Sequence, residues 1–214
     1  MQTVESVLQA LQPLLEQFRT AAVETDRSGR LPLQHLRELG RAGVYRLAVG
    51  VERGGLGAPP EVLWEVNESL AAACGSTHFV QAQHQGGLGF LLRGNAALLQ
   101  EAHLSGQRLC GVAFAHLRRQ QSPVTVTTVS EGWVFRGEEP WFSGWGLMDE
   151  VLRAGRDEHG QDIYALVSLA QDGIEMRESP PLSAIQASAT VSLVLNDLLV
   201  PSDALVLTQT LGEM

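Results

Sequence analysis

The chain of 214 residues is poor in positive charge: 15 lysines and arginines stand against 24 acidic residues, giving a net charge of -9 at pH 7. Excess negative charge disfavours binding to nucleic-acid phosphates and to anionic membrane surfaces. The sequence also lacks any run close to the roughly 20 consecutive apolar residues that a membrane-spanning helix needs. We therefore expect neither a nucleic-acid partner nor a membrane partner.

Cysteine is scarce, with only Cys74 and Cys110, far apart in the chain. This pair favours reduced, partly buried thiols over a disulfide or a pair of metal ligands. Residues 1–25 contain three glutamates and lack the basic-then-apolar pattern of a signal peptide, so we expect a cytoplasmic protein. The length allows one large or two small domains with a hydrophobic core.

The first half of the chain has helical periodicity. From Val4 to Phe18 apolar residues recur every three or four positions, as on one face of a helix. Pro32 and the pair Pro59-Pro60 stand where a first-turn proline is tolerated, and a glycine-punctuated loop follows Val44. The predicted helices cover residues 3–25, 33 to 40 or 43, 60–75, 77–92 and 95–104.

After Leu109 the pattern changes to short β-branched segments separated by turn signals. Strands are predicted at residues 124–129, 133–135, 151–154, 163–167 and 191–195. Helices followed by strands, without βαβ alternation, predict an α+β protein. We expect an all-helical domain at 1–108, a small antiparallel β-barrel or sandwich domain at 109–206, and the start of a linker or tail at 207–214.

One segment of the strand half favours a ligand. Gly137 is a turn signal, Pro140 can only open a strand, and side chains two apart on a strand share a face. Trp141 and Ser143 are thus predicted to lie side by side, an aromatic plane next to a hydroxyl, which suits a planar heteroaromatic ligand such as a flavin ring. The alternative is that Trp141 caps a β-core and Ser143 begins a turn.

Four segments, in order along the chain, resemble motifs of the acyl-CoA dehydrogenase superfamily, over its N-terminal helical and middle β domains. They are Gly54-Gly55-Leu56-Gly57, the run from Gly106 to Ala115, Trp133-x-x-x-Gly137 followed by Trp141-Phe-Ser143-Gly144, and Ser188-x-Thr190 followed by the run from Val194 to Pro201. Together they cover nearly the whole chain.

The resemblance implies a site for FAD. Trp141 matches a tryptophan that packs on the flavin ring, and Ser143 a threonine that hydrogen-bonds it. Phe114 and Ala115 match strand-end positions facing the pyrimidine edge. The implied cofactor-binding set is Phe114, Ala115, His116, Trp141, Phe142 and Ser143.

The chain also departs from the family. Ala115 replaces a hydrogen-bonding threonine, the Gly-Ser turn that holds a thioester is missing or shortened, and Glu138-Glu139 stands where the family has lysine. The sequence stops at Met214, soon after Pro201, whereas the family continues into a helical bundle that supplies the catalytic base and the tetramer core. We therefore expect a homo-oligomer, or a partner chain that supplies the bundle.

Several charged residues are candidates for substrate binding or catalysis. Arg118 and Arg119 are predicted to bind a substrate pyrophosphate, and His116 to carry a proton, on a loop that follows a strand end. The alternative is a solvated basic turn. Glu138 and Glu139 are candidates for a carboxylate base beside the flavin. Because a turn just before a proline is usually solvated, neither is assigned, and the catalytic residues stay unknown.

No metal site is expected. His78 and His84, six residues apart, do not stack on one helix face, and helix surface or satisfied polar core fits them better. The run Gly86-Gly87-x-Gly89 has no preceding strand, so close helix packing explains it better than a dinucleotide fingerprint.

Three functions follow from the sequence. The first is a flavin-dependent dehydrogenase that acts on an acyl-CoA or a related small acyl compound and is incomplete without a helical bundle. The second is a non-catalytic scaffold or assembly subunit, a remnant of the same family. The third is a flavin-dependent monooxygenase on the same scaffold, which needs no thioester turn.

Overall fold

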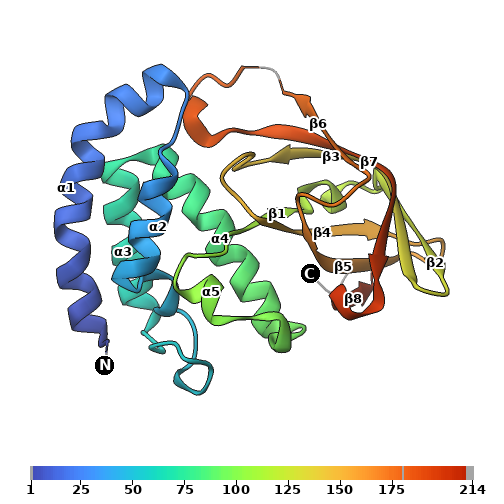
Figure 1. Cartoon of the computed structure of the whole chain (residues 1–214), viewed down its shortest axis with the longest axis horizontal. Coiled ribbons are helices and arrows are strands. Elements are labelled where there is room, and N and C mark those ends of the chain that lie inside the picture. Colours follow the sequence, from blue (N-terminus) through green and yellow to red (C-terminus); the bar gives the residue numbers. More distant parts are fainter. Residues whose placement is uncertain (1, 180, 211–214) are drawn as a thin grey trace.

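The computed structural model describes residues 2–179 and 181–210 (Figure 1). The helices are α1 (Val4–Ser28), α2 (Leu33–Ala42), α3 (Pro60–Ala73), α4 (Gly75–Arg93) and α5 (Glu101–Leu104). The strands are β1 (Cys110–Ala113), β2 (Val124–Val129), β3 (Gly132–Phe142), β4 (Glu150–Arg156), β5 (Gln161–Ser168), β6 (Ile174–Glu178), β7 (Val191–Pro201) and β8 (Leu205–Thr210). The predicted α+β class, helices first and strands second, is confirmed.

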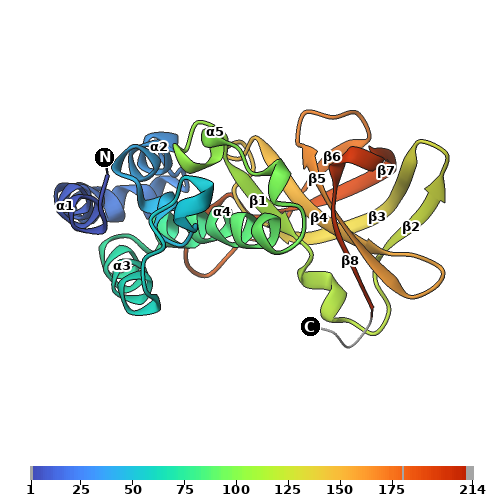
Figure 2. The same cartoon turned by 90° about the horizontal axis from the view of Figure 1, so that it is seen from below.

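The helices form because their apolar stripes meet a common centre. In α1, Thr3 and Ser6 cap the first turn reciprocally, and the buried stripe is Val7, Leu11, Leu15 and Phe18. Helix α4 contacts α1, α2 and α3 and also β1, so it lies between the other helices and the sheet (Figure 2). This central position explains why α4 is buried on more than one side.

The helix predicted at 95–104 is wrong in its length. Asn95 caps a short 3-10 turn, Ala96–Leu98, through a hydrogen bond from the N–H of Ala97. The chain is extended at Leu99 and Gln100, and only then does α5 begin. Apolar spacing alone does not reveal this break, because Ala102 lies at helical intervals from both Leu98 and Leu99 across it.

The strands form one curved sheet in the order β6-β7-β3-β2-β4-β5-β8, with β1 added beside β4. The pairs β1–β4 and β2–β4 are parallel and all others antiparallel. Among the described residues, β6 and β8 end this order, so the sheet curls without closing (Figure 2). The parallel β1 is the strand that carries the chain from the helices into the sheet.

Strands β6 and β8 were not predicted. Four of the five residues of β6 are exposed, so it lacks the apolar alternation of a half-buried strand. Residues 207 to 210, where the sequence suggested a linker or tail, continue β8 and pair with β5; residues 211–214 lie outside the described part.

One hydrophobic core joins the two halves. Its main cluster combines residues of α1 to α4 with Ala113 of β1, Phe142 of β3, Val151 of β4 and Leu193 of β7. Two smaller clusters lie in and around the sheet. Cys74 and Cys110 are buried and unpaired, which confirms the predicted free thiols. None of the helices in the described part of the chain has both the length and the apolarity required to cross a bilayer.

Candidate functional site

A hollow of about 660 Å³ lies where α4, the end of β1, the end of β3 and β8 meet. It is lined by Gln83, Phe90 and Arg93 of α4, by Val112, Ala113, Phe114, Ala115 and Arg118 in and after β1, by Pro140 and Trp141 of β3, and by Leu207, Thr208 and Gln209 of β8. Four residues singled out from the sequence are thus brought together here: Phe114, Ala115, Arg118 and Trp141.

Trp141 reaches the hollow through a β-bulge. The register between β3 and β7 shifts between Glu139 and Phe142, and Pro140 within the bulge has no N–H for the ladder. Trp141 has φ 65°, in the left-handed region, which costs an L-residue about 1–2 kcal/mol. Its side chain is 53% exposed. A large aromatic side chain is therefore presented to the hollow at a cost in backbone energy.

Ser143 does not share that exposed face. It is buried, and its hydroxyl lies 2.7 Å from the Thr190 hydroxyl, which also lies 2.8 Å from that of Ser188. The prediction that Trp141 and Ser143 point the same way is wrong, because the left-handed turn at Trp141 breaks strand alternation. Phe142, also in the predicted set, is fully buried in the main core.

The turn after β1 separates the three charged residues predicted there. His116 is buried, and its Nε2 lies 3.0 Å from the carbonyl oxygen of Ala154. Burial lowers the pKa of His116 to about 4, so the ring is neutral at pH 7 and Nε2 donates to that carbonyl. His116 therefore lies buried and outside the lining of the hollow, and its roles in binding the cofactor and carrying a proton stay predictions. Arg118 and Arg119 are exposed, and only Arg118 lines the hollow.

The hollow is aromatic and positively charged. The rings of Phe90 and Phe114 have centroids 4.6 Å apart. The guanidinium carbon of Arg93 lies 4.2 Å from the centroid of the Phe90 ring, a cation–π contact. Neither Arg93 nor Arg118 forms an ion pair among the described residues, and none of the lining residues is acidic. Such a hollow suits a flat ring system that carries an anionic group.

The two glutamates before Pro140 differ sharply. Glu138 is exposed to solvent and pairs with Arg177 at 2.5 Å. Glu139 is fully buried, with Oε2 3.5 Å from Nη2 of the equally buried Arg153. Burial raises the pKa of Glu139 to about 7, while Arg153 opposes the rise. The expectation of a solvated turn is wrong for Glu139. The sequence feature that indicates a buried partner for a carboxylate is Arg153, which stands inside the apolar run from Val151 to Ala154.

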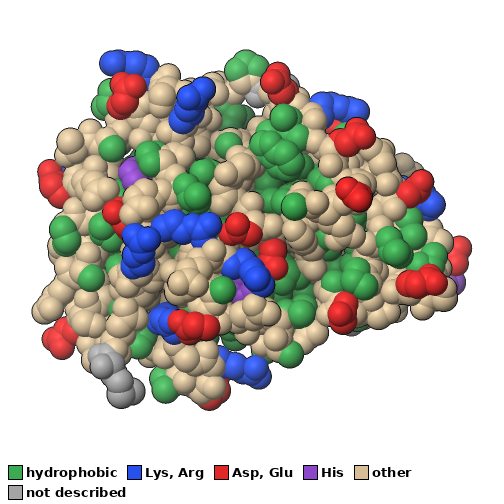
Figure 3. All heavy atoms as spheres, in the orientation of Figure 1, with side chains coloured by type: hydrophobic (Ala, Val, Ile, Leu, Met, Phe, Trp, Pro, Cys, Tyr) green, Lys and Arg blue, Asp and Glu red, His purple; other side chains and the backbone are tan. Residues whose placement is uncertain are grey.

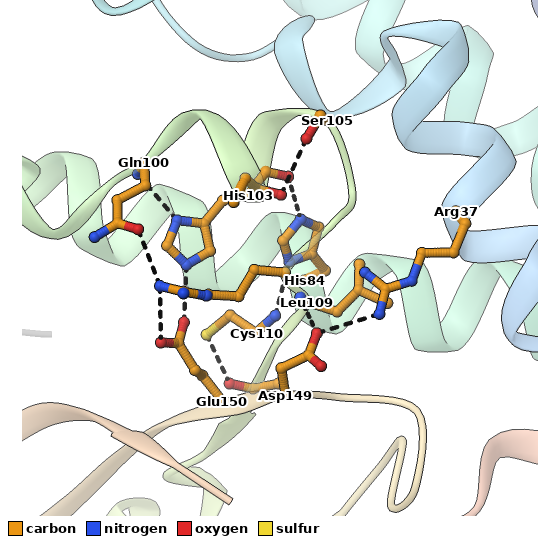
Figure 4. Close-up of polar contacts among 12 residues, drawn as sticks. Arg37, His84, Gln100, His103, Ser105, Leu109, Cys110, Asp149 and Glu150 are labelled. Atoms are coloured by element: carbon orange, nitrogen blue, oxygen red, sulfur yellow. Dashed lines mark hydrogen bonds and ion pairs between the residues drawn. The ribbon is translucent and has the colours of Figure 1, made fainter.

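A polar junction links the helices to β1 and β4 (Figure 4). His84 Nδ1 accepts from the N–H of Cys110 at 3.0 Å, so its Nε2 carries the hydrogen and donates to the carbonyl of His103 at 3.1 Å. His103 Nε2 lies 2.8 Å from Glu150, and Asp149 accepts from the N–H of Leu109 at 2.7 Å. His84 is thus a satisfied polar core residue, as predicted, and burial lowers its pKa to about 4.

A second hollow, of about 540 Å³, lies among α2, α5 and the Gly54-Gly55 loop. Three arginines line it, but Arg37 pairs with Asp149, and Arg46 with Glu101. Figure 3 shows basic and acidic side chains next to one another at several places on one face of the molecule. Two of the three arginines are thus paired within the protein, and this second hollow has no aromatic lining among the described residues, which leaves the aromatic hollow as the better candidate site.

No family model matches the chain, but individual proteins are similar to it. The oxygenase subunit HsaA of a flavin-dependent monooxygenase from Mycobacterium tuberculosis is 35% identical over 78 residues, 36% of this chain and 20% of that protein. The bovine mitochondrial short-chain specific acyl-CoA dehydrogenase is 24% identical over 197 residues, 86% of this chain and 48% of that protein.

Solved structures with a similar fold include proteins of the same kinds as the sequence matches. The crystal structure of dibenzothiophene monooxygenase TdsC from Paenibacillus sp. A11-2 superposes with a TM-score of 0.81 at 20% identity, over 94% of this chain and 52% of that one. The chain spans about half the length of such neighbours or less. At this identity the likeness shows the fold, and the predicted resemblance is confirmed at that level.

Proposed function

Since this chain has the helical and β-domain fold shared by acyl-CoA dehydrogenases and related flavin monooxygenases, we propose that it is the flavin-binding part of a flavin-dependent oxidoreductase. The observation that carries the proposal is the hollow, with Trp141, Phe90 and Phe114 as aromatic lining and with Arg93 and Arg118, which have no ion-pair partner in the described part of the chain. Fold alone does not decide function, so the argument depends on these side chains.

The residues fit a flavin. An isoalloxazine ring is flat and largely apolar, and the half-exposed indole of Trp141 offers it a face on which to stack. A phosphate or pyrophosphate carries negative charge that planar guanidinium groups hold by paired hydrogen bonds. In a chain with a net charge of -9, two arginines without acidic neighbours in the hollow favour an anion there. FAD is the expected flavin, and FMN is the alternative to test.

The chain's own residues would bind and orient the cofactor, while the flavin, when bound, supplies the redox chemistry. Trp141 and Pro140 line the hollow and would limit access of water to a bound ring. Ala115, where the resembling family has threonine, offers only backbone groups for hydrogen bonding. Among the residues that the structure describes, the lining contains no carboxylate or histidine that could remove a substrate proton.

Monooxygenation is the reaction that we favour. Dehydrogenation of an acyl-CoA needs a turn that holds the thioester, and the sequence after Ala115 lacks the Gly-Ser turn that does so in the resembling family. HsaA and TdsC, two proteins of this fold, are named as monooxygenases, and TdsC was crystallised with FMN and indole. We propose a small aromatic substrate, a reductase that delivers reduced flavin, and assembly with a second copy or a partner chain. We place the protein in the cytoplasm.

Flavin binding tests the first part of the proposal. Purified protein is titrated with FMN and with FAD while flavin absorption and fluorescence are recorded. The Arg118→Ala variant should bind at least about tenfold more weakly, because a charge-assisted hydrogen bond contributes about 1.5–3 kcal/mol. Arg119→Ala is the matched control and should bind like the wild type, since Arg119 does not line the hollow. Failure to bind either flavin would contradict the proposal and favour a non-catalytic scaffold.

Reaction assays separate the two chemistries. Reduced flavin, oxygen and indole should give oxygen consumption beyond that of flavin alone, and a hydroxylated product by mass spectrometry. A short-chain acyl-CoA with an artificial electron acceptor should give no turnover. Turnover of the thioester without oxygen consumption would overturn the monooxygenase assignment and restore the dehydrogenase.

A further inference from the structure

The Glu139–Arg153 pair lies directly behind the hollow. Glu139 precedes Pro140 and Trp141, which line the hollow, and Arg153 is the β4 partner of Ala113, which lines it too. Strands β3 and β4 are not neighbours, because β2 lies between them in the sheet order. The pair therefore spans the inside of the curved sheet and connects the Trp141 bulge to the β1–β4 side of the hollow.

The Glu139–Arg153 pair has a high desolvation cost for a contact that would only stabilise the fold. Both side chains have no exposed surface. Neither carboxylate oxygen of Glu139 and none of the three guanidinium nitrogens of Arg153 has a hydrogen-bond partner among the described residues. Burying two charges without further hydrogen bonds often stabilises a fold less than apolar residues of similar size would. Stability alone is a poor reason for this arrangement.

The strained backbone at the Trp141 bulge has to be held in place by its surroundings. Trp141 holds a left-handed backbone conformation, and the ladder between β3 and β7 is interrupted between Glu139 and Phe142. A strained residue keeps its conformation only where its surroundings hold it. Glu139 is the last β3 residue paired with β7 before the bulge, where it faces Leu193. An ionic contact at this point limits how far the bulge can shift.

We infer that Glu139 and Arg153 are positioning residues, which hold the Trp141 bulge in the orientation that completes the aromatic hollow. The inference rests on the proposed function for its consequence, weaker flavin binding. Its structural content, the placement of the Trp141 indole, is measurable without any flavin.

The test uses the full chain with both charges replaced. In Glu139→Leu/Arg153→Met no buried charge is left alone, so folding is expected even where Glu139→Gln or Arg153→Met fails to fold. Acrylamide quenching of Trp141 is obtained as the difference between each protein and the same protein carrying Trp141→Phe. We expect wild-type thermal stability, a Trp141 quenching constant changed at least about twofold, and flavin binding weakened at least about tenfold, since small displacements in a binding site are costly.

Glu138→Gln is the matched control. It removes a neighbouring carboxylate on the same strand, whose partner Arg177 is exposed, and should change neither quenching nor flavin binding. The charge-swapped variant Glu139→Arg/Arg153→Glu should recover part of the wild-type quenching.

The inference is overturned if the double apolar variant shows wild-type Trp141 quenching and wild-type flavin affinity, because the pair would then be dispensable. Should the wild type bind no flavin, the proposed function fails, while quenching of Trp141 still decides the positioning role.

Discussion

At the scale of single residues, Trp141 combines an unfavourable backbone with a role in the hollow. Trp141→Gly relieves about 1–2 kcal/mol of left-handed backbone strain in the folded protein. It also raises the conformational entropy of the unfolded chain, which lowers the free energy of unfolding by about 0.4–1 kcal/mol. We therefore expect its free energy of unfolding in urea to stay within about 1 kcal/mol of the wild type, with flavin binding lost. Trp145→Gly, which removes a partly buried ring packed on the main core, should cost more than about 2 kcal/mol.

Residue roles were predictable where they depend on local chemistry alone. The exposed aromatic at Trp141 followed from its proline and glycine neighbours. The burial of Ser143 did not, because it depends on a dihedral at the preceding tryptophan and on Thr190, 47 residues away. Arg118 and Arg119 look equivalent in sequence, and only the direction of a short turn separates them.

At the scale of elements, two adjacent glycines of α4 make opposite predictions. A methyl group at Gly86 would meet nothing within 4 Å, so Gly86→Ala should stabilise the helix by about 0.5–1 kcal/mol. A methyl group at Gly87 would lie 2.8 Å from Cys110 Sγ, so Gly87→Ala should destabilise by about 1–3 kcal/mol. Urea unfolding of both variants checks this contrast, and equal effects would contradict it.

The glycines of α4 also show how far a sequence pattern predicts helices, strands and their packing. Helices with one strong apolar stripe, such as α1, were placed within a few residues. Close packing, expected for the whole run Gly86-Gly87-x-Gly89, holds only for Gly87, since Gly86 and Gly89 face open space. Strand β8 was missed because its formation depends on pairing with β5, which no short window of sequence contains.

At the scale of the whole molecule, acid should weaken the fold through His84. Its pKa is about 4 in the folded protein and about 6.5 when unfolded, so the unfolded chain binds more protons between these values. Neutral His84 thus contributes about 3 kcal/mol to the free energy of unfolding above pH 6.5. This contribution is lost as the pH falls toward 4.

Urea unfolding of the wild type and of His84→Gln from pH 4 to pH 7 measures this contribution. Glu139, whose pKa is raised to about 7, acts with the opposite sign, because stability from it falls as the pH rises from 4.5 to 7. Its effect is common to both proteins and cancels in the difference. A wild type and variant with parallel pH profiles would show that His84 does not titrate as described.

The polar junction and the shared core have a consequence for cooperativity. We propose domain limits at 1–108 and 109–206, yet the main cluster draws on both sides of that boundary, and Cys110 is hydrogen-bonded to His84 across it. Heating should therefore melt helices and strands in one calorimetric peak, with equal calorimetric and van't Hoff enthalpies. Two resolved peaks would mean that each half melts alone, and that the cleft between them is free to open and close around a ligand.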